Sequence, residues 1–270
     1  MKSYVDSLPS ALDLVEFLNT NATLYKPAVF LDYDGTLTPI VDDPAKALLD
    51  PKVKEKIDEL SKLCLVGIIS GRDRADVEGK VGLPSLVYAG SHGYDISGPD
   101  ITMAHPKGVE CLPSMDEAEK ELAECLKDVK GARVERKKFA IAVHYRHVAS
   151  EEVSTVLALV DKVLKKYACL KPGPGKMIME LRPDFEWHKG KALWFLMEQV
   201  ANQDNIFPIY LGDDMTDEDA FVTLEERGAG VMVGDHGNES SATYRLNDTE
   251  EVYSFLSELV ELLKSNSLYQ

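Results

Sequence analysis

Residues 30–39 have the sequence FLDYDGTLTP, which is the clearest indication of the fold of this chain. It joins the end of an apolar run, Ala28–Leu31, to polar residues that begin with Asp32. A short apolar run bounded by turn-forming residues is typical of a buried strand, and the glycine that follows indicates a loop. The stretch therefore predicts a buried strand whose carboxyl end carries two aspartates, Asp32 and Asp34.

The same pattern recurs on both sides of a middle segment. Apolar runs predict strands, and the amphipathic stretches between them predict helices. The strands are expected at 28–31, 64–69, 86–89, 207–211 and 230–233, and the helices at 52–64, from 74, and at 187–201, 217–226 and 252–264. Strands that alternate with helices predict an α/β fold, a doubly wound parallel sheet of the Rossmann-like type.

The middle segment has a different pattern. After Pro106 we expect helices at 116–130 and 151–167, and alternating strands at 139–145 and 177–181. Helix–strand units whose strands are polar on one side predict an open-faced α+β module inserted into the first domain. The expected organisation is a first core segment at 1–106, the inserted module at 107–183 and a second core segment at 184–270.

Composition limits the partners of the chain. Its 270 residues are 44% hydrophobic and 28% charged, as in an ordinary globular protein, and the formal net charge is −16. This charge predicts no binding to nucleic acid or to an anionic membrane, and a small-molecule phosphate ester that approaches this surface would need a local cation. The four cysteines form no CxxC pair and the amino terminus lacks the apolar region of a signal peptide, so we expect a reducing, cytoplasmic location. The sequence does not identify a partner protein.

Two clusters at predicted strand ends suit phosphate chemistry, and in parallel sheets this edge is where ligands bind. Asp32 can attack phosphorus and form an acyl phosphate. Asp34, two residues later, can protonate the leaving oxygen and then activate water. Ser70, after the next strand, can donate to a phosphate oxygen. Solvated loop aspartates and a helix N-cap serine are the ordinary alternatives.

Two further clusters lie in the second half of the chain. Lys189, at a helix start, can neutralise charge on a transferring phosphoryl group, although an exposed lysine is the ordinary alternative. Five acids stand between 213 and 219, and some of them suit the N-terminus of the following helix. The others would repel one another without a cation. All-oxygen ligands with no cysteine or histidine nearby predict magnesium.

Together these clusters resemble the four motifs of the haloacid dehalogenase superfamily of phosphatases, and the inserted module resembles that superfamily's C2-type cap. A larger part of the chain, residues 30–221, resembles one subfamily, the trehalose-phosphate phosphatases. The segments that carry this resemblance are FLDYDGTLTP (30–39), SGR (70–72), GSHG (90–93), VERK (134–137), VHYR (143–146), MELRP (179–183), WHKG (187–190) and LGDDMTDEDAF (211–221). One position departs, because His188 stands where relatives commonly have Asp or Asn.

The resemblance implies a catalytic set and a metal set. The catalytic set comprises Asp32 as nucleophile, Asp34 as general acid/base, and Ser70 and Lys189 on the phosphoryl oxygens, with Arg72 nearby at the substrate. The metal set places magnesium on Asp32, the Asp34 carbonyl and Asp213, with Asp214 and Asp217 orienting ligands or metal-bound water.

The resemblance also places sugar recognition in the inserted module, on Glu135, Lys137, Arg146, Lys176 and Glu180. Carboxylates and cations along one strand face can accept from and donate to several sugar hydroxyls, but a solvated polar face is the ordinary alternative for an antiparallel sheet. The six histidines show no metal-binding spacing. His92 follows a strand end and is expected to face the substrate, while His144 is expected to be packed or hydrogen-bonded within the module.

The function implied by the resemblance is hydrolysis of trehalose 6-phosphate to trehalose and phosphate through an aspartyl phosphate, the final step of trehalose biosynthesis. One alternative is a phosphatase for another sugar phosphate, such as sucrose phosphate or mannosyl-phosphoglycerate. Another is a catalytically idle sugar-phosphate sensor on the same fold. The presence of both Asp32 and Asp34 argues against the sensor, because an inert relative could lose the acid/base.

Overall fold

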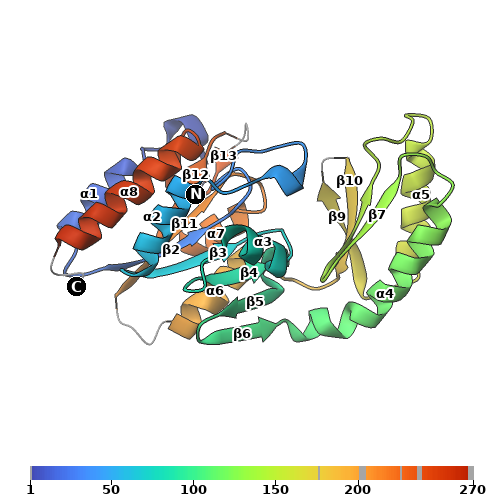
Figure 1. The fold of residues 1–270 in the computed structure, drawn as a ribbon, viewed down its shortest axis with the longest axis horizontal. Coiled ribbons are helices and arrows are strands. Elements are labelled where there is room, and N and C mark those ends of the chain that lie inside the picture. The colour runs from blue at the N-terminus through green and yellow to red at the C-terminus, as the bar shows by residue number, and fades with distance from the viewer. Residues whose placement is uncertain (1, 176, 201–204, 226, 236–238, 267–270) are drawn as a thin grey trace. The chain divides into compact units, whose positions relative to one another are not determined.

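The structure is a computed structural model that describes residues 2–175, 177–200, 205–225, 227–235 and 239–266. The chain divides into two units, Met1–Met103 with Trp187–Gln270, and Ala104–Glu186 (Figure 1). The second unit is therefore one continuous excursion from the first.

The first unit contains a large sheet with helices on both sides. Its helices are α1 (Leu12–Thr20), α2 (Pro51–Ser61), α3 (Arg74–Val81), α6 (Lys189–Val200), α7 (Glu218–Leu224) and α8 (Thr249–Ser265). Its strands are β1 (Ser3–Tyr4), β2 (Lys26–Leu31), β3 (Leu65–Ile69), β4 (Val87–Gly90), β5 (Asp95–Gly98), β6 (Ile101–Ala104), β11 (Ile206–Gly212), β12 (Ala229–Val233), β13 (Glu239–Ser240) and β14 (Tyr244–Leu246).

The sheet has the order β14-β12-β11-β2-β3-β4-β5-β6. The strands from β14 to β4 are parallel, and β5 runs antiparallel to β4. This parallel α/β arrangement confirms the predicted fold class. The short antiparallel strands β5 and β6 were not predicted.

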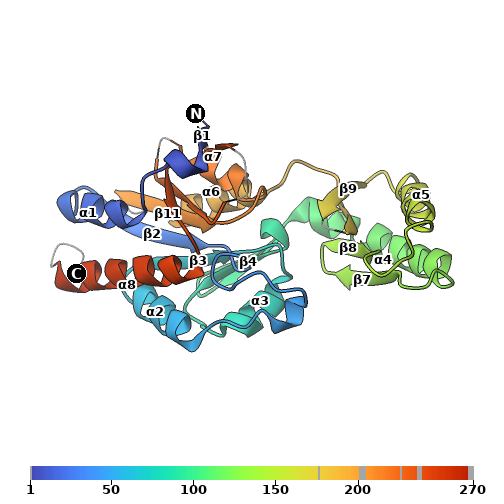
Figure 2. The same ribbon diagram turned by 90° about the horizontal axis from the view of Figure 1, so that it is seen from above.

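Strand β2 shows how the sheet buries both faces. Val29 and Leu31 lie in one hydrophobic core with α1, α2, α3 and α8, while Ala28 and Phe30 lie in a second core with α6 and α7. Figure 2 shows α6 and α7 on one side of the sheet and α2, α3 and α8 on the other. A strand buried on both faces has no polar alternation, which is why the sequence around Ala28–Leu31 is a continuous apolar run.

The helices begin where the sequence supplies caps. Asp50 accepts a hydrogen bond from the Lys52 amide at the start of α2, and Pro51 occupies the first helical position. Asp248 accepts from two backbone amides at the start of α8. Such caps satisfy amide groups that have no partner inside the helix, and each contributes about 1 kcal/mol.

The second unit is an antiparallel sheet covered on one side. It comprises α4 (Pro106–Leu126), β7 (Arg133–Lys137), β8 (Ala140–His144), α5 (Val153–Leu164), β9 (Leu170–Gly175) and β10 (Ile178–Pro183), with the strand order β7-β8-β10-β9. Met115 of α4, Val160 of α5 and Ile141 of β8 belong to one hydrophobic core. The helices thus cover one sheet face and leave the other to polar side chains.

Helix α4 corrects one prediction. It begins at Pro106, ten residues before the expected start at Asp116, and it contains Pro113. Pro106 is well suited to the first helical position, where its missing N–H has no helical partner to lose. In the part of the chain that the structure describes, no helix is long and apolar enough to cross a bilayer.

Candidate active site

Three neighbouring parallel strands bring the predicted catalytic residues to one edge of the sheet. β11, β2 and β3 lie side by side, and their carboxyl ends lead into Asp213, Asp32 and Ser70. The Asp32 amide donates a hydrogen bond to the Leu211 carbonyl at 2.9 Å. The loop after β2 is therefore fixed against the end of β11.

Lys189 joins two carboxylates at this edge. Its Nζ lies 3.1 Å from Asp32 Oδ1 and 2.7 Å from Asp217 Oδ1. All three side chains are buried, since Asp32 is 5% exposed, Lys189 2% and Asp217 0%. Buried charges are stable only when they are paired, as they are here. The ordinary alternatives, an exposed lysine and solvated loop aspartates, therefore do not apply to this cluster.

Asp217 is held by four donors of the chain itself. Its Oδ1 accepts from Lys189 Nζ and from the Tyr210 hydroxyl, and its Oδ2 accepts from the Asp213 and Asp214 amides, each at 3.1 Å. The carboxylate therefore links the lysine to the backbone of the acidic loop. Tyr210 was not predicted, and only its position on a strand that ends in the acid segment could have suggested it.

Asp213 faces the loop that carries Asp32. A Cβ added to Gly35 would lie 2.0 Å from Asp213 Oδ2, and Gly35 has a φ of +83°. Only glycine allows the two loops to approach this closely. Carboxylate oxygens of Asp32, Asp213 and Asp217 lie within 4.8 Å of one another.

This acid cluster fits a hard cation. Asp213 Oδ1 is shielded from solvent and has no hydrogen-bond partner among the described residues, and the same holds for Thr36 Oγ1 in the neighbouring loop. A buried oxygen without a donor is costly unless something else satisfies it. The donors are all oxygens, which is the set that magnesium prefers.

The acids perturb one another electrostatically. Burial, together with the charge of Asp217, raises the pKa of Asp213 from 3.8 to about 7. Burial also raises the pKa of Asp32 well above 3.8, although Lys189 opposes this. Burial lowers the pKa of Lys189, but Asp217 and Asp32 outweigh it and hold the lysine charged. Strongly perturbed groups gathered at one sheet edge are typical of a catalytic site.

Asp34 has a different partner. Arg72 binds it in a bidentate pair, with Nε 2.7 Å from Asp34 Oδ2 and a terminal nitrogen 2.7 Å from Oδ1. The same guanidinium donates to Asp76 and to the Pro44 carbonyl. Four of the five N–H donors of Arg72 are thus used by the chain, and its geometry fixes the plane of the Asp34 carboxylate.

Ser70 and His92 meet at the end of β3. Ser70 is 1% exposed, and its hydroxyl oxygen accepts from the Arg72 amide at 3.2 Å, which leaves its proton for donation. The His92 amide donates to the Ser70 carbonyl, and its ring lies over Gly71, where an added Cβ would stand 3.0 Å from the imidazole. These two predicted residues therefore lie together.

Asp214 lies at the surface of the acidic loop. Its Oδ1 accepts from the Thr216 amide at 2.8 Å and from the Thr216 hydroxyl at 2.7 Å. This carboxylate shapes the turn that leads to Asp217.

The predicted sugar-binding residues lie in the second unit. Lys137 Nζ lies 2.9 Å from Glu180 Oε1, and His144 Nε2 lies 2.9 Å from Glu135 Oε2. His144 is thus hydrogen-bonded within the module, as expected. Arg146 is exposed in the turn after β8, beyond this sheet face. Lys176 lies outside the residues that the structure describes.

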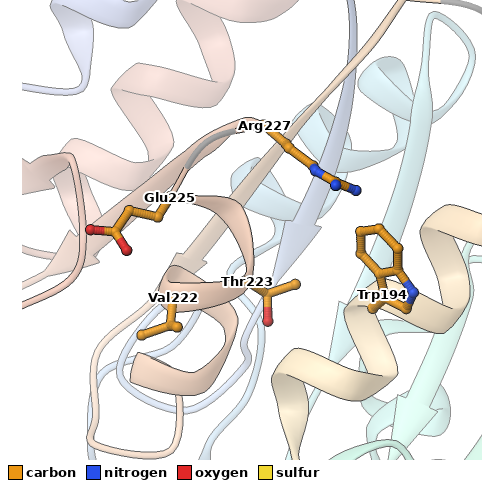
Figure 3. A pocket seen from close by; sticks show the side chains of 5 residues that line it. All are labelled: Trp194, Val222, Thr223, Glu225 and Arg227. Atoms are coloured by element: carbon orange, nitrogen blue, oxygen red, sulfur yellow. The ribbon is translucent and has the colours of Figure 1, made fainter. Parts of the chain in front are cut away.

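A separate pocket of about 300 Å³ is lined by Trp194, Val222, Thr223, Glu225 and Arg227 (Figure 3). The Arg227 guanidinium lies 4.8 Å from the centre of the Trp194 ring. None of the predicted site residues lines this pocket. We therefore place the candidate site at the acid cluster.

Comparison with known proteins agrees with the resemblance. Residues 30–250 match the profile of a family described as trehalose-phosphatase. The chain is 41% identical over 272 residues to a protein named probable trehalose-phosphate phosphatase D of Arabidopsis thaliana, covering 96% of this chain and 74% of that protein. Its structure is similar to the C-terminal domain of the C. albicans trehalose-6-phosphate phosphatase, with a TM-score of 0.75 and 25% identity over 94% of this chain and 98% of that one.

A haloacid dehalogenase-like hydrolase from Bacteroides thetaiotaomicron shares the fold more distantly. The TM-score is 0.59 and the identity 15%, over 86% of this chain and 98% of that one. At this identity the likeness concerns the fold alone.

Proposed function

Because the chain belongs to the trehalose-phosphatase family, we propose that it hydrolyses trehalose 6-phosphate to trehalose and phosphate, the final step of trehalose biosynthesis. The observation that carries the chemistry is the buried Lys189 held between Asp32 and Asp217. A lysine so placed neutralises the charge of an incoming phosphoryl group next to a carboxylate nucleophile.

The reaction proceeds in two displacements. An oxygen of Asp32 attacks the phosphorus, the bond from phosphorus to the sugar oxygen breaks, and Asp34 gives that oxygen a proton. The product of this step is an aspartyl phosphate and free trehalose. Asp34 then takes a proton from water as the water attacks phosphorus, which releases phosphate and restores the Asp32 carboxylate.

Magnesium is the cofactor of this proposal. Asp32, the Asp34 carbonyl and Asp213 would hold it, and Asp213 Oδ1 supports this because it is buried without a donor among the described residues. When bound, the ion supplies positive charge that offsets the repulsion between the carboxylates and the phosphate. Asp217 already accepts from four donors, so we assign it to orienting Lys189 and the acidic loop.

Arg72 is assigned a positioning role. Its fork is filled by Asp34, Asp76 and the Pro44 carbonyl, so it has little capacity left for substrate. Holding Asp34 in one orientation aims its oxygens for proton transfer, which reduces the reorganisation needed during the reaction. Ser70 retains a hydroxyl proton and is assigned to a phosphoryl oxygen, with His92 beside it.

We assign sugar recognition to the unit Ala104–Glu186. Its open sheet face carries Glu135, Lys137 and Glu180, which offer both acceptors and donors to sugar hydroxyls. Glu180 is only 16% exposed and is paired with Lys137, which orders both side chains before substrate binds. Arg146 and Lys176 complete the proposed set. The cytoplasmic location stays a prediction.

The decisive experiment is phosphate release from trehalose 6-phosphate, sucrose 6-phosphate and glucose 6-phosphate, with and without magnesium. We expect trehalose 6-phosphate to have the highest kcat/KM. A preference for sucrose 6-phosphate would support the alternative sugar phosphatase. Failure to release phosphate from any ester would support the idle sensor.

A further inference from the structure

The open face of the second sheet carries a cation, Arg182, that the proposed chemistry does not use. Arg182 follows Glu180 by two residues on β10, while Met179 and Leu181 belong to the hydrophobic core. Side chains alternate between the two faces of a strand. Arg182 and Glu180 therefore lie on the same open face.

The side chain of this arginine lies against Gly173. It stands opposite Glu180 on the neighbouring strand β9. A Cβ added to Gly173 would lie 2.4 Å from Arg182 Nε and 2.8 Å from its Cζ, so the guanidinium lies directly over the glycine backbone. Gly173 does not have the positive φ that would itself require glycine. Room for Arg182 is thus the reason for glycine here.

One donor of this guanidinium has no partner in the part of the chain that the structure describes. Arg182 Nε is shielded from solvent and has no acceptor there. The other strand cations of this face that the structure describes are occupied. Arg133 is paired with Glu135, Lys137 is paired with Glu180, and Lys171 donates to the Phe185 carbonyl. A buried donor without an acceptor destabilises the protein, so a ligand oxygen that accepted a hydrogen bond from this group would gain affinity.

The surrounding charges indicate which ligand. Glu135 and Glu180 stand in one row across the sheet, on either side of Ala142, and Gly173 extends that row. An anion placed over Gly173 would meet these carboxylates. A hydroxyl group suits the position better, because it donates its proton to a carboxylate and accepts from the guanidinium.

We propose that Arg182, seated over Gly173, is a further sugar-binding residue that donates to hydroxyl oxygens of the glucose unit farther from the phosphate. The inference rests on the proposed function. It adds a specificity-determining contact to those of Glu135, Lys137 and Glu180, and it explains why a glycine interrupts strand β9 beside Glu180.

The test uses the whole chain and two substrates, trehalose 6-phosphate and 4-nitrophenyl phosphate. Arg182→Ala should lower kcat/KM for trehalose 6-phosphate roughly tenfold to a hundredfold, because a buried sugar-binding site is left with an unpaired group. Arg182→Lys should recover little, since an ammonium lacks the planar fork. Hydrolysis of 4-nitrophenyl phosphate should stay within twofold. Lys165→Ala, on the exposed surface of the same unit, is the matched control.

Gly173→Ala provides an independent readout, because its methyl group displaces the guanidinium. It should lower kcat/KM for trehalose 6-phosphate as Arg182→Ala does, and the double variant should be no worse than Arg182→Ala alone. Additive losses would overturn the inference, and so would an Arg182→Ala enzyme within twofold of wild type. Equal losses on both substrates would also overturn it. A wild-type enzyme that does not hydrolyse trehalose 6-phosphate overturns the proposed function and, with it, this inference.

Discussion

Replacing Asp213 by asparagine should stabilise the metal-free protein while it removes activity. Burial and neighbouring acids raise the pKa of Asp213 from 3.8 to about 7. Between pH 3.8 and about pH 7, the Asp213 carboxyl group therefore keeps its proton in the folded state and has lost it in the unfolded chain. As pH rises from 3.8 through 7, the contribution of Asp213 to the free energy of unfolding falls, and it levels off above that range.

The magnitude follows from the same values. A difference of about 3 pH units corresponds to roughly 4 kcal/mol at pH 8. Asparagine removes the charge but keeps a polar group to be buried, so we expect a net gain of roughly 2–3 kcal/mol. For a chain of this size, that gain raises Tm by about 4–12 °C.

The assay is thermal unfolding with a chelator present, from pH 4 to pH 8. The Tm difference between Asp213→Asn and wild type should vanish near pH 4 and be largest at pH 8. Asp219→Asn, at an exposed acid of the same segment, is the control and should change Tm little. Added magnesium should stabilise wild type by mass action and leave Asp213→Asn almost unchanged. A Tm difference that does not depend on pH would refute the electrostatic reasoning.

Three further outcomes test the mechanism. Asp32→Asn should abolish phosphate release and leave the circular dichroism spectrum unchanged, because an amide cannot form the acyl phosphate; near-normal turnover by the folded variant would exclude Asp32 as nucleophile. Chelation should abolish activity, with magnesium restoring it and zinc restoring it poorly, because the ligands are hard oxygens; full activity after exhaustive chelation would contradict the metal site. Glu180→Ala should lower kcat/KM for trehalose 6-phosphate at least tenfold and leave 4-nitrophenyl phosphate hydrolysis unchanged, because its partner Lys137 and the sugar hydroxyls lose an acceptor; equal losses would assign Glu180 to the fold.

The sequence predicted the strands best where both faces of a strand are buried. Strands such as β2 and β11 are covered on both faces, and their continuous apolar runs made them visible. Strand β9 was missed because its sequence, LKPGPG, contains two prolines and two glycines. Proline is tolerated there because β9 lies at the edge of the four-stranded sheet.

The sequence predicted which residues form the site better than it predicted the contacts between them. Strand ends showed that Asp32, Ser70 and Asp213 would share one edge of the sheet. The contact of Arg72 with Asp34 depends on how two loops fold across that edge, and no spacing in the sequence encodes it. Tyr210 is a similar case. A tyrosine inside an apolar strand looks like an ordinary core residue in the sequence, and only the structure shows that its hydroxyl donates a hydrogen bond to Asp217.

The close approach of backbone to acid at Gly35 and Gly212 restricts how this protein can evolve. An added Cβ would stand 2.0 Å from the Asp213 carboxylate in one case and 2.2 Å from the Asp217 carboxyl carbon in the other. Every missense change at either codon introduces a Cβ atom. We therefore expect no substitution at either position among the active variants of a saturation-mutagenesis library. Ala104–Glu186 is one uninterrupted segment and contains neither glycine. On the proposed assignment of sugar recognition to that segment, genetic exchange or drift within it would change the substrate preference without altering the phosphoryl-transfer chemistry.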